Sequence, residues 1–257
     1  MDLELMGARA LVTGGSAGIG LATARLLAGE GAQVAIVSRS PQAAAAEAGT
    51  AAIAADLASP QGPVRAVEAA VSELGGLDLL VNNAGTARIA TFEELTDDDW
   101  EGAWSLNVMS YVRCIRAALP ALRGSDRAAV VNVASTSGKR PSPGMPHYSV
   151  TKSAVLSLSR LVADVYAGEG IRCNAVCPGP ARTPAWLAAG GLADQTAERS
   201  GRTRDAVLDS VGAGRPLGRM AEPEEIAAVV AFLCSPRSSY VTGAAWSADG
   251  GTVPIII

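Results

Sequence analysis

Seven short runs of apolar residues recur along this chain, and glycine or polar residues bound most of them. Runs that are apolar at successive positions are typical of strands buried on both faces of a parallel sheet. The pattern predicts strands at residues 8–13, 34–37, 51–55, 77–81, 128–133, 171–176 and 244–248.

The segments between these runs have the start signals and spacing of helices. Acidic residues follow Thr96, and Pro223 stands at a first turn, as both do where helices begin. The pattern predicts helices at residues 18–28, 42–48, 60–74, 96 to about 122, 222–234, and one that contains Tyr148 and continues to about 167. Pro120 is expected to end or kink its helix near Leu122.

Strands and helices alternate without an internal boundary, which predicts one doubly wound, Rossmann-like α/β domain over residues 1–257. Residues 181–216 lack strand signals, and a segment this long is more often a functional lid than a connector. We therefore expect a substrate lid at about 181–216. The apolar tail, residues 252–257, is expected to pack against the protein, and residues 254–257 could serve an interface.

Composition narrows the class of protein. The 257 residues are 49% hydrophobic and 18% charged, which is a globular composition. A net charge of −4 without a basic run makes nucleic acid an unexpected partner. The longest apolar run, 226–234, is too short to span a membrane, and no signal peptide is recognisable, so we expect a cytoplasmic protein. Four scattered cysteines and one histidine predict no metal site.

A glycine turn follows the first predicted strand and opens a helix. Gly14, Gly18 and Gly20 are spaced G-x-x-x-G-x-G, where backbone can approach a pyrophosphate that the helix N-terminus stabilises. The spacing differs from G-x-G-x-x-G, and an ordinary strand–helix connection would also explain it.

The ends of the second and third strands bear on the choice of cofactor. Ser38 and then Arg39, neutral and cationic, suit the 2′-phosphate of NADP(H), whereas an acidic residue would favour NAD(H). Ser16 could help to bind the 2′-phosphate. The alternative interpretation of Arg39 is a solvated arginine on a loop, without a role in binding. Asp56 could meet an adenine amino group or cap the next helix.

Polar residues also follow the fourth and fifth strands. Asn83, Ala84 and Gly85 leave room for a flat ring, although a turn alone explains much of that pattern. Asn107 in mid-helix either faces solvent or bonds a functional group. Ser135 lies just past a strand, where open α/β sheets bind ligands, and also reads as a turn residue.

Tyr148 and Lys152 are four residues apart and so lie on one face of a helix. A neighbouring ammonium favours the phenolate and is expected to draw the pKa of Tyr148 from about 10 toward neutrality. Such pairs are also common on amphipathic helices without any function. His147 points off this face, and we interpret it as a surface or substrate-loop residue.

These motifs in this order resemble the short-chain dehydrogenase/reductase family over essentially the whole chain. The resemblance rests on Thr13-Gly14-x-x-x-Gly18-Ile19-Gly20, Asp56, Asn82-Asn83-Ala84-Gly85, Asn107, Ser135, Tyr148-x-x-x-Lys152 and Pro178-Gly179. It implies a seven-stranded parallel sheet with helices on both faces, a nicotinamide dinucleotide at the carboxyl ends of the strands, and a homotetramer.

The resemblance also implies a catalytic tetrad of Asn107, Ser135, Tyr148 and Lys152. Ser135 would donate to the substrate oxygen and Tyr148 would pass the proton. Lys152 would lower the Tyr148 pKa and bond the nicotinamide ribose, and Asn107 would hold a water that links Lys152 to solvent. Thr183 would contact the carboxamide. Ala17 replaces the basic residue of some NADP-preferring members.

The expected cofactor is NADP(H), with NAD(H) possible. Its predicted contacts are Gly14, Ser16, Gly18, Ile19, Gly20, Ser38, Arg39, Asp56, Leu57, Asn83, Ala84, Gly85, Tyr148, Lys152, Pro178, Gly179 and Thr183. The predicted substrate contacts are Ser137, Met145 and Trp186.

The predicted function is hydride transfer between nicotinamide and a small-molecule ketone or secondary alcohol. The alternatives are an NAD-dependent diol or polyol dehydrogenase and a nucleotide-binding regulator without turnover. The intact tetrad argues against the regulator.

Overall fold

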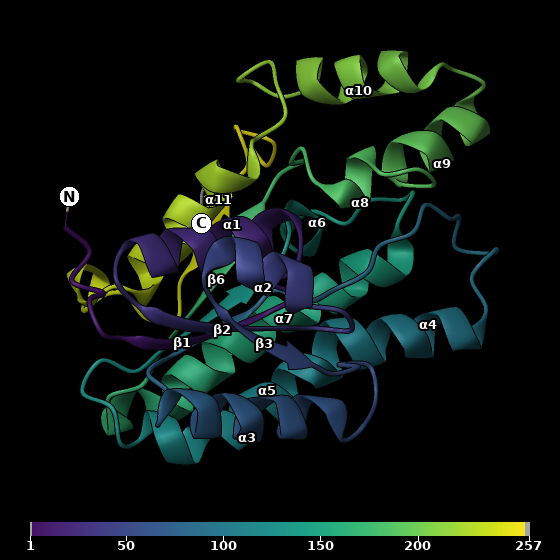
Figure 1. Ribbon diagram of the computed structural model, residues 1–257. Coiled ribbons are helices and arrows are strands. Elements are labelled where there is room, and N and C mark those ends of the chain that lie inside the picture. The colour runs from purple at the N-terminus through teal and green to yellow at the C-terminus, as the bar shows by residue number, and fades with distance from the viewer. Residues whose placement is uncertain (1, 255–257) are drawn as a thin grey trace.

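A seven-stranded, entirely parallel sheet runs through the computed structural model, which describes residues 2–254 (Figure 1). Its strands are β1 (Arg9–Thr13), β2 (Gln33–Ser38), β3 (Ala51–Ala54), β4 (Leu79–Asn82), β5 (Ala129–Val133), β6 (Arg172–Pro178) and β7 (Ala245–Ala248). The predicted fold class is confirmed, because strands that are apolar on both faces need cover on both sides.

The strand order places a crevice at the centre of the sheet. The order is β3-β2-β1-β4-β5-β6-β7, so the chain winds outward in one direction from β1 and in the other from β4. Leu11 of β1 is in register with Leu80 of β4. Ligands of open α/β sheets bind at the carboxyl ends of the strands beside such a switch point.

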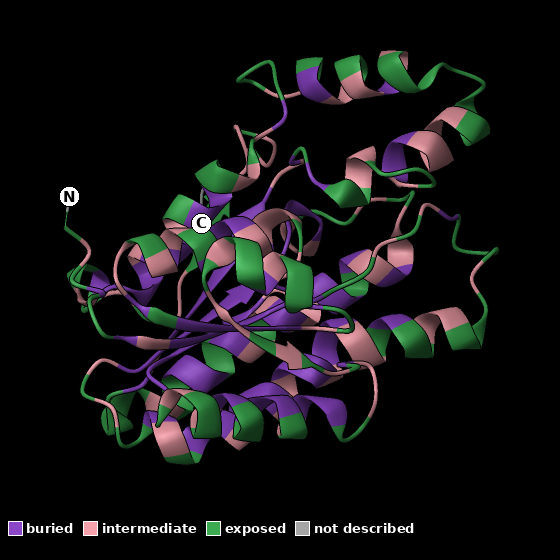
Figure 2. Ribbon diagram, in the orientation of Figure 1, coloured by how far each residue is buried: buried purple, intermediate pink, exposed green. Residues whose placement is uncertain are grey.

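Helices cover both faces of the sheet. One face carries α1 (Gly18–Gly29), α2 (Gln42–Ala48) and α11 (Pro223–Cys234), and the other carries α3 (Gly62–Leu74), α5 (Ser110–Leu122) and α7 (Pro146–Tyr166). Each face has its own apolar core: Ile36 and Ile226 belong to one, and Leu80 and Cys114 to the other. Figure 2 shows the buried residues concentrated along the strands and the inward faces of the helices.

The helix predicted to begin at Thr96 is not uniform. It comprises α4 (Asp97–Trp104), a π-helical turn (Ser105–Met109) and then α5, which ends at Leu122 with Pro120 inside its last turn. The Thr96 hydroxyl accepts from the Asp99 amide at 3.3 Å and completes a capping box. The π-helical turn was not predicted, because hydrophobic spacing does not record one extra residue in a turn.

Residues 181–216 contain three helices that the apolar pattern did not reveal: α8 (Pro184–Leu187), α9 (Leu192–Ser200) and α10 (Arg204–Ala213). They are short, and only α9 and α10 carry polar residues; in Figure 1 these two helices extend away from the sheet. A further short helix, α6 (Thr136–Lys139), follows β5, and 3₁₀ turns occupy Ala167–Glu169 and Pro236–Ser238.

Among the described residues, no helix is both long and apolar enough to cross a membrane. The tail expected at an interface, 254–257, lies outside the described residues except for Pro254.

Candidate functional site

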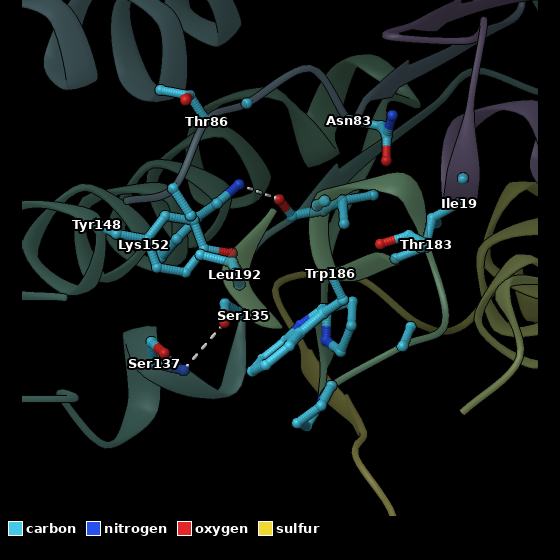
Figure 3. Close-up of a pocket in the computed structure, with 18 of the residues that line it drawn as sticks. Ile19, Asn83, Thr86, Ser135, Ser137, Tyr148, Lys152, Thr183, Trp186 and Leu192 are labelled. Atoms are coloured by element: carbon cyan, nitrogen blue, oxygen red, sulfur yellow. Dashed lines mark hydrogen bonds between the residues drawn. The ribbon is translucent and has the colours of Figure 1, made fainter. Parts of the chain in front are cut away.

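A cavity of about 360 Å³ opens at the carboxyl ends of the central strands. It brings together most of the predicted site residues, which come from segments far apart in the sequence (Figure 3). Those that line it are Gly14, Gly18, Ile19, Asn83, Ala84, Gly85, Ser135, Ser137, Met145, Tyr148, Lys152, Pro178, Gly179, Thr183 and Trp186.

The glycine turn after β1 forms a cradle whose backbone is packed too closely for side chains at Gly14 and Gly20. A Cβ at Gly20 would lie 2.3 Å from the Gly14 carbonyl oxygen, and one at Gly14 would lie 2.9 Å from the Ala84 Cα. Gly14 and Gly18 have φ of 63° and 52°, a conformation that favours glycine. The cradle therefore requires these glycines for both space and backbone conformation.

The segment after β4 is tied to this cradle. The Asn83 side-chain amide donates to the carbonyls of Thr13 and Gly14, at 3.0 and 3.2 Å. In return the Thr13 hydroxyl accepts from the backbone N–H of Asn83 at 2.8 Å and of Ala84 at 3.1 Å. These bonds hold the two sides of the crevice in a defined relation, which a simple turn would not do.

The predicted contacts to the adenosine half of the cofactor do not line this cavity. Arg39 is exposed and makes no ion pair with any residue between 2 and 254, and the neighbouring Ser38 is half-buried at the end of β2. Leu57 is buried, whereas Asp56 is exposed and its carboxylate accepts from the Ala58 amide at 3.0 Å. Helix α3 begins after Gln61, so Asp56 does not cap it.

Two further predicted contacts stand behind the cavity wall. Ser16 is half-buried in the glycine turn, and Gly20 is buried beneath it against Gly14 and Asn83. Gly20 therefore supports the cradle from behind, whereas Gly14 and Gly18 line the cavity.

The turn that carries Ser135 is held rigidly. Ser135 is the N-cap of α6, and its hydroxyl accepts from the Ser137 amide at 3.1 Å (Figure 3). Gly138 allows α6 to approach α7, because a Cβ there would lie 2.7 Å from the Lys152 carbonyl oxygen. The Ser153 hydroxyl donates to the Gly138 carbonyl at 2.8 Å and joins the two helices.

Tyr148 and Lys152 face the same cavity from the first turns of α7, with Lys152 Nζ 5.7 Å from the centre of the Tyr148 ring. Nζ donates to the Val133 carbonyl at 2.7 Å, the dashed bond beside Lys152 in Figure 3. The spacing argument is therefore correct in placing both side chains on one face.

The electrostatics of the pair differ from the expectation. Burial raises the pKa of Tyr148 above its ordinary value, and the neighbouring Ser135 hydroxyl only partly opposes this. Burial also lowers the pKa of Lys152 to about 7, so that at neutral pH the amine carries only part of a charge. The expected lowering of the Tyr148 pKa is thus not found in this site, because both groups are desolvated.

Asn107 is buried behind the cavity in the π-helical turn. Its side-chain oxygen accepts from the Thr86 amide at 2.8 Å, and its nitrogen donates to the Thr86 carbonyl and the Thr151 hydroxyl, both at 3.0 Å. A Cβ on Gly85 would lie 3.2 Å from the Asn107 oxygen and 3.5 Å from Lys152 Nζ. The side chain of Asn107 therefore does not face solvent but forms hydrogen bonds within the protein.

Two residues of the cavity wall were not singled out by sequence reasoning. Thr86 and Ala87 line the cavity, and both directly follow the Asn-Asn-Ala-Gly motif, which was the available signal. Leu192 also lines the cavity, and it lies within the lid predicted at about 181–216. Lys152 is the only ionisable side chain besides Tyr148 among the lining residues in the described part of the chain.

His147 is buried, and the interpretation of it as a surface or substrate-loop residue is wrong. Its side chain packs edge-on against Trp100 at 6.3 Å between ring centres, and the residue is only 4% exposed. Burial, followed by the repulsion of Arg88, lowers its pKa.

These residues fit a nicotinamide dinucleotide. Gly14 and Gly18 line the cavity without side chains, the N-terminus of α1 opens onto it, and polar side chains line it as well. Fold and cavity together define a doubly wound nucleotide-binding protein with ionisable side chains beside the cofactor cleft.

Comparison with known proteins places the chain within a family. The family model described as enoyl-(acyl carrier protein) reductase matches residues 14–253. The chain is 36% identical over 250 residues to the short-chain reductase protein NovJ of Streptomyces niveus, covering 94% of this chain and 92% of that protein. It is 38% identical over 250 residues to the cis-4-hydroxycyclohexanecarboxylate dehydrogenase of Sinomonas cyclohexanicum, covering 94% and 95%.

A solved structure agrees with these relatives. The L-sorbose reductase of Gluconobacter frateurii, complexed with NADPH and L-sorbose, superposes with a TM-score of 0.91 at 35% identity and full coverage of both chains. The chain belongs to the short-chain dehydrogenase/reductase family. Members of this family are oxidoreductases that use a nicotinamide cofactor on alcohol or carbonyl substrates.

Proposed function

We propose that this protein is an NADP(H)-dependent reductase of ketones and dehydrogenase of secondary alcohols. One observation carries the proposal: Ser135, Tyr148 and Lys152 line the same cavity as the glycine cradle. A cofactor held in the cradle would bring its reactive ring to these side chains. The family relationship supports this reading, and the intact set of polar residues opposes a purely regulatory role.

The chain's own residues would handle the proton while the nicotinamide supplies or accepts the hydride. Tyr148 donates its phenolic proton to the carbonyl oxygen during reduction and takes it back during oxidation. Ser135 orients that oxygen by donating a hydrogen bond to it. Lys152 supplies positive charge beside the phenol, and Asn107 orders the backbone at Thr86 next to the lysine.

The protonation state favours reduction in the free protein. Because burial raises the pKa of Tyr148, the phenol keeps its proton at neutral pH and is ready to act as an acid. Oxidation requires that proton to leave first, so its rate should rise with pH more steeply than that of reduction.

The cofactor preference depends on Arg39. Its exposed guanidinium at the end of β2 is available to a 2′-phosphate, and no carboxylate follows Ser38 to repel one. The NADPH in the related sorbose reductase supports this choice.

The cavity also suggests the character of the substrate. Its outer end presents Met145, Trp186 and Leu192 with small hydroxyl and methyl groups, and Lys152 lies deep beside Tyr148. We therefore propose an uncharged substrate with an apolar portion. A cytoplasmic homotetramer belongs to the same proposal, and size exclusion with light scattering tests the tetramer.

The decisive experiment measures NADPH and NADH oxidation with a panel of cyclic ketones, 3-oxoacyl thioesters and ketoses. We expect turnover by the wild type with at least one ketone and a loss of kcat/KM of about 100-fold or more in Tyr148→Phe. No turnover by the wild type with any substrate, or equal rates for the variant, would remove the enzymatic proposal.

A charge reversal tests the cofactor preference. In Arg39→Asp, NADPH affinity should fall by about 10- to 100-fold while NADH affinity changes little or improves, because the carboxylate repels only the 2′-phosphate. Arg116→Asp, which reverses another exposed arginine on α5, is the matched control. Unchanged NADPH affinity in Arg39→Asp would contradict the assignment.

A further inference from the structure

Lys152 is a buried amine without a carboxylate partner. The residue is 3% exposed, and no ion pair of residues 2–254 includes it. Its Nζ donates to the Val133 carbonyl at 2.7 Å and to the Tyr111 hydroxyl at 3.4 Å. A desolvated ammonium depends strongly on such neutral acceptors, because nothing else offsets the water it has lost.

Tyr111 is the less expected of these two partners. It lies four residues after Asn107, at the start of α5, and its side chain is completely buried. Its hydroxyl donates to the Val133 carbonyl at 3.1 Å, so the proton is committed there and the oxygen can only accept from Lys152. Its ring centre lies 5.3 Å from Nζ, within the range of a cation–π contact.

The three groups form a closed triangle around one carbonyl. Val133 is the last residue of β5, two positions before Ser135, and its oxygen receives both the lysine and the tyrosine. The amine therefore has two phenol rings as neighbours, with ring centres at 5.3 Å for Tyr111 and 5.7 Å for Tyr148. Only the second ring faces the cavity.

We propose that Tyr111 is a positioning residue that holds the Lys152 ammonium at the Val133 carbonyl, beside the phenol that exchanges the proton. The role of Tyr111 in catalysis rests on the proposed function, whereas its contact with Lys152 does not. The predicted catalytic tetrad does not include Tyr111. It acts through the lysine and touches neither cofactor nor substrate.

No charged group near Lys152 would mask the effect of Tyr111 on the pKa of the lysine. The groups that face Nζ are Tyr148 on its own helix, the Cys177 thiol on β6, and the neutral amide of Asn107 near Gly85. None is a carboxylate. Removing the Tyr111 hydroxyl deletes one of two hydrogen-bond acceptors, so the charged form of the amine is disfavoured further and the pKa of Lys152 falls.

The composition of the chain makes this shift directly observable. Only two of its 21 basic residues are lysines, Lys139 and Lys152. Protein labelled with ¹³C at the lysine ε-carbon gives two resonances, and Lys139→Arg assigns them. The pH titration of the Lys152 resonance in the free protein then reports its charge without any substrate.

In Tyr111→Phe we expect the midpoint of the Lys152 titration to move down by about half a pH unit or more. Tyr166→Phe is the matched control: it removes the same oxygen from the far end of α7, where Arg123 lies 5.8 Å from the ring centre. An unchanged midpoint in Tyr111→Phe, or an equal shift in Tyr166→Phe, would overturn the proposal.

A second measurement leaves Tyr111 in place and so does not depend on the stability of the variant. The chain has four tyrosines, and substitution of Tyr148, Tyr166 and Tyr240 by Phe assigns their ζ-¹³C resonances and, by elimination, that of Tyr111. In the wild type the Tyr111 resonance should shift over the pH interval in which Lys152 loses its charge. A flat Tyr111 resonance across that interval contradicts the contact.

Activity separates this inference from the proposed function. If the protein reduces ketones, the pH profile of kcat in Tyr111→Phe should move in the same direction as the lysine midpoint, and Tyr166→Phe should leave it in place. A lysine shift in a protein that turns over no substrate would support the contact and reject the enzymatic role. Turnover with a kcat profile unmoved in Tyr111→Phe would overturn the positioning role.

Discussion

Gly20 shows how completely a single position can be determined by its neighbours. The missing side chain is directed at two groups that cannot move away, the Gly14 carbonyl oxygen at 2.3 Å and the Asn83 side-chain nitrogen at 2.4 Å. Asn83 is itself committed to Thr13 and Gly14. The glycine therefore maintains the close approach of α1 to the segment after β4, on which the cradle depends.

Gly20→Ala is expected to destabilise the fold by about 2 kcal/mol or more and to weaken cofactor binding at least about tenfold, because backbone must shift to admit the methyl group. Thermal melting and fluorescence titration with NADPH measure the two effects. Gly29→Ala, in the same helix with open space around the added atom, should leave cofactor binding unchanged and stability equal or higher. Similar results for the two variants would contradict the clash.

At the scale of elements, the segment between β6 and α11 is attached to the opposite rim of the cavity. Gln195 of α9 accepts from the Ile89 amide at 2.9 Å, and Arg199 pairs with Glu94 at 2.7 Å. The same segment brings Trp186 and Leu192 to the cavity wall. Hydrogen bonds from Arg199 and then Thr91 lower the pKa of Glu94 to about 2, so the pair is ionised at every pH of interest. These contacts would have to break if the segment opens as the predicted lid.

Loss of the ion pair in Glu94→Gln should favour the open lid, raising KM about two- to fivefold with a smaller effect on kcat, and the difference from wild type should shrink at high salt. Steady-state kinetics at two ionic strengths provide the measurement. The neighbouring exposed residue offers a control, since Glu93→Gln changes the same charge without touching Arg199. Equal KM values for wild type and Glu94→Gln would argue against the lid.

At the scale of the whole molecule, one ion pair joins the two central strands at the end of the sheet away from the cavity. Arg9 at the start of β1 contacts Asp78 through Nε at 2.9 Å and Nη2 at 2.6 Å, and the Asp78 side chain is only 6% exposed. Burial alone would raise the pKa of this carboxyl, but hydrogen bonds from Arg9 and Ser125 outweigh it and lower the pKa to about 2.

A carboxyl whose pKa is lower in the folded protein than in the unfolded chain stabilises the fold above the unfolded value, and this stability is lost as pH falls. For Asp78 the loss should occur between about pH 4 and pH 2 and amount to about 2 kcal/mol. Urea unfolding at pH 7 and pH 3 of wild type and Asp78→Asn measures it. The variant should lose less stability over that interval, whereas Asp209→Asn, an exposed carboxyl, should behave as wild type.

His147 adds a second, separate acid sensitivity. Because burial lowers its pKa, the folded state resists protonation and stability should decline as pH falls below about 6.5, the ordinary histidine value. As the only histidine, it can be followed directly by NMR. A titration midpoint at or above 6.5 would contradict this assignment.

Much of the fold and part of the candidate site could be read from local patterns. The strand runs and the glycine turn depend on spacing within a few residues, and each matches an observed element. The four-residue separation of Tyr148 and Lys152 likewise placed both on one helix face. What spacing could not provide was their charge, because desolvation depends on β5, α5 and β6 packing around them.

The sequence by itself determined a parallel doubly wound sheet, the family, and which side chains end at the carboxyl edge of the strands. Only the tertiary structure decided that Tyr111 meets Lys152, that the Asn107 side chain bonds Thr86 and Thr151, and that two short helices, α8 and α9, bring Trp186 and Leu192 to the cavity. The physical reason is range. Backbone preferences and hydrophobic periodicity act over a few residues, whereas hydrogen-bond partners and burial arise between segments that the fold brings together from distant parts of the chain.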